Sequence, residues 1–274
     1  MDVGVLTAYL DRIGARRPTV LDAAALAGLH RAHQTAVPFE NLSIHLGEPI
    51  SLDEGDLIAK IVTRRRGGFC YELNGAFALL LEALGAQVSR LAARVHGEGG
   101  LGPPFDHLAL VVRLPDGSGP WLADVGFGAN SSYPLRYDSR DGQDDPGGRF
   151  SLADAPGGDL DVAKDGEPQY RLEQRERVLA DFVATCWWQQ TSPDSHFTSS
   201  TICSRLTGEG RISLSDRTLI RTSNGVRTER ELGTDGEVLA AYRDNFGIML
   251  DRVPAVARGR LPGPHPDGVR SDGS

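Results

Sequence analysis

The chain has few cysteines, and their scarcity excludes two kinds of protein. Its three cysteines, Cys70, Cys186 and Cys203, stand far apart among 274 residues with no CxxC pair. This pattern predicts neither a disulfide framework nor a zinc knuckle, and it is typical of free thiols in a reducing compartment.

Long apolar runs are also missing. No run approaches the ~20 apolar residues that a membrane span needs, and the opening residues lack the basic-then-apolar order of a signal peptide. We therefore expect a soluble, cytoplasmic protein with no membrane partner.

The chain has fewer basic than acidic residues. Asp and Glu number 37 against 29 Lys and Arg, for a formal net charge of −8. A general nucleic-acid partner is not expected, because phosphate binding needs a basic surface, although a local patch could still hold a small anion. The hydrophobic (40%) and charged (24%) shares are those of a globular protein and argue against disorder.

The spacing of apolar residues changes along the chain. Before about residue 86, apolar residues recur at helical spacing in four segments, which predicts helices that pack together. The third segment opens with Ser51-Leu52-Asp53-Glu54, a capping-box pattern. From about Val88 the period becomes two, which predicts strands. The expected order is a helical part, a β-rich part and a smaller mixed part.

Turn signals divide the β-rich and mixed parts. Residues 107–114 and 121–125 should form a hairpin, and Asn224-Gly225 should form a type I′ turn. The acidic segment 138–148 should be a flexible loop. A helix over 177–190 should bury Trp187 and Trp188 in the core or at a domain interface. Further strands are expected at 88–95, 168–176, 197–206 and 211–222, and a last helix runs from 234 to about 245.

Two glycines precede Cys70 at the start of a predicted helix. Gly67 and Gly68 would let the chain turn sharply and place Cys70 in the first helical turn. There the helix dipole and the unpaired N–H groups favour a thiolate, a nucleophile suited to acyl transfer. The alternative is that Cys70 is a small buried apolar residue, as most free cysteines are.

A histidine and an acid flank the predicted hairpin. His107 opens its first strand, and Asp124 ends the second among Trp, Leu, Ala and Val. Strand pairing would bring the two to the same end, where a buried carboxylate needs a partner such as an imidazole N–H. The carboxylate would fix the tautomer of the imidazole, and the imidazole would take the proton of Cys70. The alternative for His107 is a surface histidine at a turn.

At this point the residues resemble a known family. The run 66–74 (Arg-Gly-Gly-Phe-Cys-Tyr-Glu-Leu-Asn) is similar to the active-site motif of arylamine N-acetyltransferases. The runs 37–42 (Val-Pro-Phe-Glu-Asn-Leu) and 124–128 (Asp-Val-Gly-Phe-Gly) resemble two further family blocks, and residues 9–14 and 195–197 add weaker matches. Together they cover residues 9 to 200 in family order.

The resemblance implies an α+β fold in three parts. These are a helical bundle over 1–86, a β-barrel over 87–205 and an α/β lid over 206–253, followed by a flexible tail over 254–274. The Cys-His-Asp core would be similar to that of cysteine proteases. Acetyl-CoA would be the donor co-substrate, with no metal, and arylamines, arylhydrazines or N-hydroxyarylamines would be the acceptors. A homodimer is left open.

The resemblance also assigns roles to residues. Cys70, His107 and Asp124 would be the catalytic triad, and Gly126 and Gly128 would lie where the backbone approaches the pantetheine of CoA. Asp106, directly before the histidine, departs from the family pattern, and its charge could affect the thiol site or the donor. The acceptor pocket would be formed by Phe39, Val95, Phe127 and Phe197.

Other interpretations stay open. An amide synthase of the same family would close a macrolactam from a carrier-bound polyketide with a similar triad. A catalytically silent binding protein would keep the fold without the chemistry. Glu40 and one of Arg64, Arg65 and Arg66 should form a structural ion pair, the alternative being an arginine that meets a CoA phosphate. His30, His33 and His196 show no ligand set for a metal, and Cys186 and Cys203 should be inert packing thiols.

Overall fold

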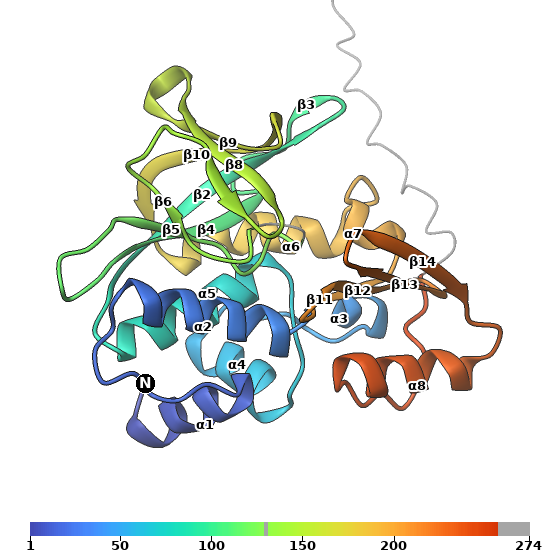
Figure 1. Cartoon of the computed structure of the whole chain (residues 1–274). Helices are drawn as coiled ribbons and strands as arrows, with labels where there is room; N and C mark the ends of the chain where they lie inside the picture. The colour runs from blue at the N-terminus through green and yellow to red at the C-terminus, as the bar shows by residue number, and fades with distance from the viewer. Residues whose placement is uncertain (129–130, 257–274) are drawn as a thin grey trace, which may run out of the picture.

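A computed structural model describes residues 1–128 and 131–256 of the chain (Figure 1). It has a helical part, a barrel-like sheet and a smaller sheet backed by one helix, which confirms the expected α+β architecture. The tail beyond Val256, for which a flexible conformation is expected, lies outside the described residues. Among the residues described, no helix is both long enough and apolar enough to cross a membrane.

Short polar side chains begin the N-terminal helices. Asp2 and Asp22 accept backbone N–H groups of the first turns of α1 and α2, and Gly14, with φ of 68°, ends α1. The capping box expected at 51–54 does not form, because Ser51 Oγ accepts the N–H of Asp53 within the preceding turn. The helices of this part are α1 (Val3–Ile13), α2 (Ala23–Ala36), α3 (Leu42–Leu46), α4 (Glu54–Ile58), a π-helical turn (Ala59–Thr63) and α5 (Cys70–Ala83).

Helix α5 lies at the centre of the molecule. Every residue from Cys70 to Leu81 is buried, including the polar Glu72 and Asn74, so the helix is covered on all sides instead of on one apolar face. Its neighbours are the other helices and the outer faces of strands β2 and β4, whose side chains Ala92, Leu108 and Leu110 join the same core. The residue that begins α5 is therefore fixed by the largest core of the protein.

A nine-stranded sheet curls into a barrel around its own apolar core. The strands follow the order β6-β5-β4-β2-β10-β9-β8-β7, and β3 pairs with β2. The Gln143 side chain links the two end strands, accepting the N–H of Arg136 at 2.6 Å and donating to its carbonyl at 3.0 Å. The strands are β2 (Gln87–Gly97), β3 (Gly100–Leu101), β4 (His107–Arg113), β5 (Trp121–Ala123), β6 (Leu135–Arg136), β7 (Gln143–Asp145), β8 (Gly148–Asp154), β9 (Leu160–Lys164) and β10 (Glu167–Arg177).

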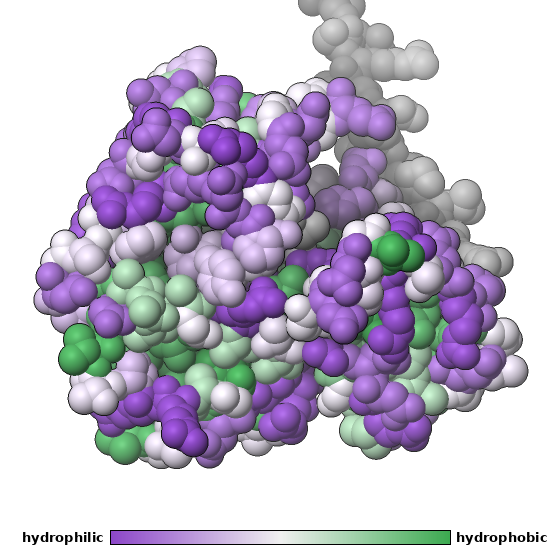
Figure 2. Space-filling model, in the orientation of Figure 1, coloured by the Kyte–Doolittle hydropathy of each residue, from purple (hydrophilic) through white to green (hydrophobic). Residues whose placement is uncertain are grey.

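The expectation of a flexible loop over 138–148 is wrong. Strand β7 lies inside that segment, and the Asp145 carboxylate accepts the N–H groups of Ser132 and Tyr133. Acidic side chains here bind backbone N–H groups and close the barrel, a role that composition alone does not show. The barrel surface facing the viewer in Figure 2 is mainly hydrophilic.

The smaller sheet joins distant parts of the chain. Its order is β1-β11-β12-β13-β14, so that a strand from the helical part forms one edge. Asn224 and Gly225 have φ of 50° and 80°, which confirms the type I′ turn. The expected strand 211–222 is broken by a turn at Asp216, where φ is 49°. The elements are β1 (Phe39–Glu40), β11 (Ile202–Leu206), β12 (Gly210–Ser215), β13 (Thr218–Ser223), β14 (Val226–Glu231) and α8 (Asp235–Phe246).

Two short helices connect the barrel to the smaller sheet. They are α6 (Val183–Thr191) and α7 (His196–Ser199), so the first residues of the strand expected at 197–206 are helical. Trp187 on α6 is 65% exposed, so the expectation that it is buried in the core or at a domain interface is wrong, whereas Trp188 is half-buried. The sheet that follows begins at Ile202, before the expected start of the lid at residue 206. We call this sheet together with α8 the lid.

A buried ion pair ties the segment before α5 to β1. Arg66 donates two hydrogen bonds to Glu40 and pairs with Glu48 at 2.9 Å, which confirms the expected structural ion pair. Burial opposes ionisation of Glu40, but the charges of Lys60 and Arg66 outweigh it and hold its pKa below the ordinary value. Arg64 and Arg65 are exposed.

Replacing Arg66 by methionine should lower the free energy of unfolding by about 3–5 kcal/mol, because it leaves Glu40 buried and charged without its ion-pair partner. Urea denaturation measures the change. Arg64→Met is the matched control and should change stability by less than about 0.5 kcal/mol. Equal losses in the two variants would contradict a structural role that is specific to Arg66.

Candidate active site

The segment just before Cys70 packs so closely against its neighbours that it requires glycine at both 67 and 68. A Cβ on Gly67 would lie 1.9 Å from the Pro38 carbonyl oxygen, and one on Gly68 would lie 2.7 Å from the Glu72 side chain. The N–H of Glu40 donates to the Gly68 carbonyl at 2.8 Å, and the N–H of Phe69 donates to Glu72 at 3.2 Å. These contacts fix the start of α5 and with it the sulfur of Cys70.

The Cys70 sulfur is buried but borders a cavity. The residue is 4% exposed, and its Sγ lies 4.0 Å from the carbonyl oxygen of Asp106. Burial raises the pKa of the thiol well above its ordinary value, and the carboxylates of Asp106 and Asp124 act in the same direction. Burial therefore opposes the thiolate that the start of the helix is expected to favour. A thiolate at this position needs a cation beside it.

His107 and Asp124 meet at the same end of the expected hairpin. Strands β4 and β5 pair with Leu110 opposite Ala123, and His107 Nε2 lies 2.8 Å from Asp124 Oδ2. A carboxylate can only accept, so Nε2 carries the proton and Nδ1 is the nitrogen left to accept another. Burial alone would raise the pKa of Asp124, but the charge and hydrogen bond of His107 hold it below the ordinary value.

Asn74 anchors the carboxylate from inside α5. Its Nδ2 donates to Asp124 Oδ1 at 2.9 Å and to the Leu108 carbonyl at 2.6 Å, while its Oδ1 accepts the N–H of Val125 at 2.9 Å. One amide therefore joins α5 to β4 and to the loop that follows β5. Asn74 lies in the sequence run that resembles the family motif, but its connecting role depends on strand pairing.

His30 supports the same loop from α2. Its Nε2 accepts the N–H of Asp124 at 3.2 Å, and its Nδ1 lies 3.1 Å from the Ser132 carbonyl and 2.9 Å from Gln34 Nε2. Burial lowers the pKa of His30 to about 4, which keeps the ring neutral at pH 7 as the accepting role requires. Sequence spacing gave no signal for this residue, because the contact spans 94 positions.

One cavity of about 410 Å³ is lined by the residues predicted to bind the acceptor and the pantetheine. Cys70 and His107 line it together, and Asp124 lies behind His107. The lid closes one side with Ile202 and Ser215. His107 contacts Phe127 with ring centroids 5.0 Å apart. The predicted acceptor and pantetheine residues that line the cavity are Phe39, Val95, Gly126, Phe127, Gly128 and Phe197.

Packing within the protein is sufficient to explain why residue 126 is glycine, without a bound ligand. A Cβ there would lie 2.8 Å from Cys70 Cα and 2.8 Å from Asn74 Nδ2. Gly128 is different, because its φ of 69° favours glycine while no atom would contact an added Cβ within 4 Å. Gly126 thus sets the approach of the Asp124 loop to the thiol.

Asp106, the departure from the family pattern, is held at the cavity wall. Its carboxylate accepts the Val95 N–H at 3.3 Å and Gln189 Nε2 at 2.7 Å. Burial raises its pKa above the ordinary value, although its hydrogen bonds and the nearby His107 and His196 oppose the shift. It adds negative character near Cys70 that does not favour a thiolate.

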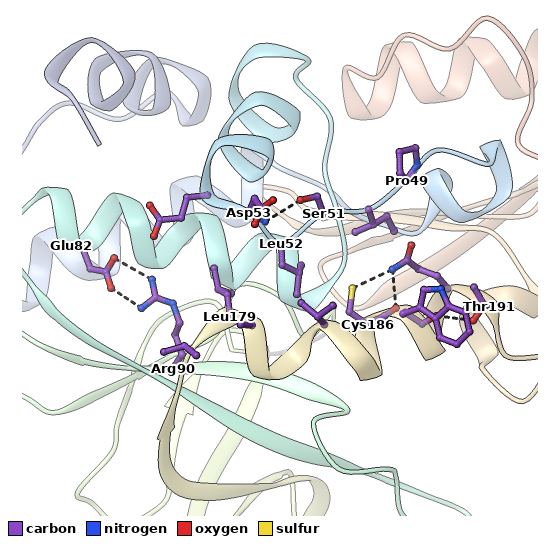
Figure 3. A pocket seen from close by; sticks show the side chains of 16 residues that line it. Pro49, Ser51, Leu52, Asp53, Glu82, Arg90, Leu179, Cys186 and Thr191 are labelled. Carbon is purple, nitrogen blue, oxygen red and sulfur yellow. Dashed lines mark hydrogen bonds and ion pairs between the residues drawn. The ribbon is translucent and has the colours of Figure 1, made fainter.

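A larger cleft of about 900 Å³ lies between the segment before α4 and helix α6 (Figure 3). Arg90 and Glu82 at its edge pair with each other at 2.7 Å. Cys186 lines it, but burial raises the pKa of this thiol to about 12, and Gln190 Nε2 contacts its sulfur at 3.4 Å. The cleft therefore has no activated nucleophile. Within residues 1–128 and 131–256, no three His, Cys, Asp or Glu side chains group as a metal site requires.

The chain is similar to a well-defined set of proteins. A family model described as N-acetyltransferase matches residues 22–255. Arylamine N-acetyltransferase of Mycolicibacterium smegmatis is 33% identical over 259 residues, covering 91% of this chain and 93% of the relative. Arylamine N-acetyltransferase / N-hydroxyarylamine O-acetyltransferase of Salmonella typhimurium is 33% identical, covering 90% of each. The structure of Mycobacterium marinum arylamine N-acetyltransferase in complex with CoA matches with a TM-score of 0.82 at 34% identity, covering 89% of this chain and 92% of that one.

Replacing Asn74 by aspartate should destabilise the protein increasingly as pH rises. Burial and the Asp124 charge would raise the folded-state pKa of the new carboxyl, so the part of its cost that comes from charge is absent at low pH and grows above about pH 4. We expect a loss of about 3 kcal/mol at pH 7, measured by urea denaturation across pH.

Asn245→Asp is the matched control for the same exchange. Its new carboxylate would face Arg221 Nη2, which donates to Asn245 Oδ1 at 2.6 Å. Its stability should not fall as pH rises. A pH-independent loss in Asn74→Asp would show that the charge beside Asp124 is not the cause.

Proposed function

Because the chain belongs to the arylamine N-acetyltransferase family, we propose that this acyltransferase carries an acetyl group from acetyl-CoA to aromatic amines on Cys70. Acetyl-CoA is the co-substrate of the family. The observation that supports the route most directly is that Cys70 and His107 line one cavity, with His107 bonded to the buried Asp124 at 2.8 Å.

In the first half of the reaction, the Cys70 thiol gives its proton to His107 Nδ1 as the sulfur attacks the thioester carbonyl of acetyl-CoA. Asp124 holds Nε2 and stabilises the imidazolium that forms. Backbone N–H groups near Cys70 would stabilise the oxyanion of the tetrahedral intermediate. The carbon–sulfur bond to CoA then breaks, and the CoA sulfur takes the proton from His107. The product is acetyl-Cys70 and free CoA.

In the second half, an amine attacks the carbonyl of acetyl-Cys70. His107 takes the amine proton, the bond to Cys70 breaks, and the proton returns to the sulfur. Phe39, Phe127 and Phe197 would hold the aromatic ring of the acceptor, which can be an arylamine or arylhydrazine. The hydroxyl of an N-hydroxyarylamine could attack in the same way, giving O-acetylation.

The cavity size supports a small acceptor. About 410 Å³ is at the lower end of small-ligand sites and suits an aromatic amine better than a long carrier-bound chain. Macrolactam closure is therefore not the function we propose.

Formation of the acetyl-enzyme tests the proposal. Wild-type protein with acetyl-CoA should release CoA and show one acetyl group on Cys70 by mass spectrometry of the intact protein and of peptides. Arylamines and hydrazines should remove it and yield parallel double-reciprocal lines. Cys70→Ala should lose activity and Cys186→Ala should keep it. Activity that survives in Cys70→Ala would refute the thioester route.

Replacing His107 by glutamine should slow alkylation of Cys70 by iodoacetamide at least tenfold at neutral pH. Burial raises the pKa of this thiol, so without a base beside it little thiolate exists. In the variant the rate should rise steeply with pH, whereas the wild-type rate should be flatter. Cys203, which is fully buried, is the internal control and should stay unmodified in both. Equal rates in both proteins would rule out His107 as the base.

A further inference from the structure

A basic cleft opens where the helical part, the barrel and the lid meet. Its volume is about 620 Å³. Three cations line it from three parts of the fold: Arg31 on α2, Lys164 on β9 and Arg211 on β12. Glu209 is the one carboxylate among the lining residues. This positive lining is unusual in a chain of net charge −8.

The Arg31 guanidinium is held in place, and one of its N–H donor groups has no hydrogen-bond partner. Its Nη1 is buried and has no hydrogen-bond partner, its Nη2 lies 3.5 Å from the Thr207 carbonyl, and its guanidinium stands 5.5 Å from the centre of the Tyr133 ring. A buried donor left unpaired costs free energy. The donor lies beside a cleft that is large enough to bring it an acceptor.

Arg211 is also poorly partnered. Among the described residues, its guanidinium donates one hydrogen bond, from Nη1 to Ser204 Oγ at 3.1 Å. Burial lowers its pKa to about 10, so it remains charged at pH 7. In the part of the chain that the structure describes, neither Arg31 nor Arg211 forms an ion pair, whereas Arg66 and Arg90 face carboxylates. Two such guanidiniums at one cleft indicate an anionic ligand that is not part of the chain.

The cleft lies one strand length from the thiol cavity. Strands β11 and β12 pair Ile202 with Ser215 at the thiol cavity and Leu206 with Arg211 at the basic cleft. The four residue-to-residue steps from Ile202 to Leu206 span about 13 Å. An extended pantetheine arm, from its sulfur to the first phosphorus of CoA, is about as long as four residues of extended chain, roughly 14 Å.

We propose that the basic cleft binds the diphosphate of acetyl-CoA through Arg31 and Arg211 while the thioester lies at Cys70. The proposal rests on the proposed function for its ligand. Lys164 adds a third positive charge, and the turns at Gly208 and Gly225 leave room for phosphate oxygens because they carry no side chain. Arg31 and Arg211 would thereby gain the acceptors that the chain does not supply.

The experiment compares donors with and without phosphates. Arg31→Gln and Arg211→Gln should each raise KM for acetyl-CoA roughly tenfold or more, since each loses charge-assisted hydrogen bonds. Neither should change KM for acetyl-pantetheine, which has the thioester and lacks the diphosphate. Arg211→Lys keeps a charge without the fork and should fall between wild type and Arg211→Gln. Arg227→Gln removes an exposed charge elsewhere on the lid and should leave both KM values unchanged.

Several results would overturn the proposal. One is an unchanged KM for acetyl-CoA in the folded glutamine variants, and another is an equal rise for both donors, which would indicate a structural role. Inorganic pyrophosphate that binds through Arg211 without competing with CoA would show a separate phosphate ligand and overturn the donor assignment.

Direct titration of CoA separates this proposal from the proposed function. Loss of CoA binding in Arg211→Gln supports the cleft even if no amine is acetylated. A wild type that acetylates amines while its CoA affinity is insensitive to both arginines overturns the cleft alone.

Discussion

The Asp124 carboxylate is the point on which the arrangement of the site depends. It is buried, and its hydrogen bonds reach three parts of the fold: Asn74 in α5, His107 in β4 and the N–H of Gly126 in its own loop. His30 holds its backbone from α2. A buried carboxylate without these partners would be strongly unfavourable. The need to satisfy it therefore aligns the helix carrying Cys70 with the strand carrying His107.

Burial has opposite consequences at the two ends of this network. Around Asp124 it is compensated by donors, and the pKa of the carboxylate falls. Around Cys70 the neighbouring charges are negative, and the pKa of the thiol rises. In the mechanism we propose, ionisation of this thiol is coupled to proton transfer to His107. The same desolvation strengthens the interaction between imidazolium and thiolate once they form.

Strands β11 and β12 of the lid line both the thiol cavity and the basic cleft. Its first strand pairs with β1 of the helical part, and the Arg66–Glu40 ion pair lies behind β1. The β11–β12 pair therefore has a fixed position between the thiol cavity and the basic cleft. The chain has a net charge of −8, yet cations predominate in the lining of this cleft. The local field, not the net charge, determines whether an anionic ligand is attracted.

Local features could be read from the amino-acid order: the Asn224-Gly225 turn, the order of helical and β-rich parts, and the run from Arg66 to Asn74 with its glycines. These depend on neighbours within a few residues, whose preferences can be read directly. Packing sets the strand in 143–145, the exposure of Trp187, the raised pKa of Cys70 and the hydrogen bonds of His30 and Arg211. Each depends on groups brought together from distant positions, and desolvation and hydrogen-bond partners at such distances are set by packing, which sequence spacing does not encode.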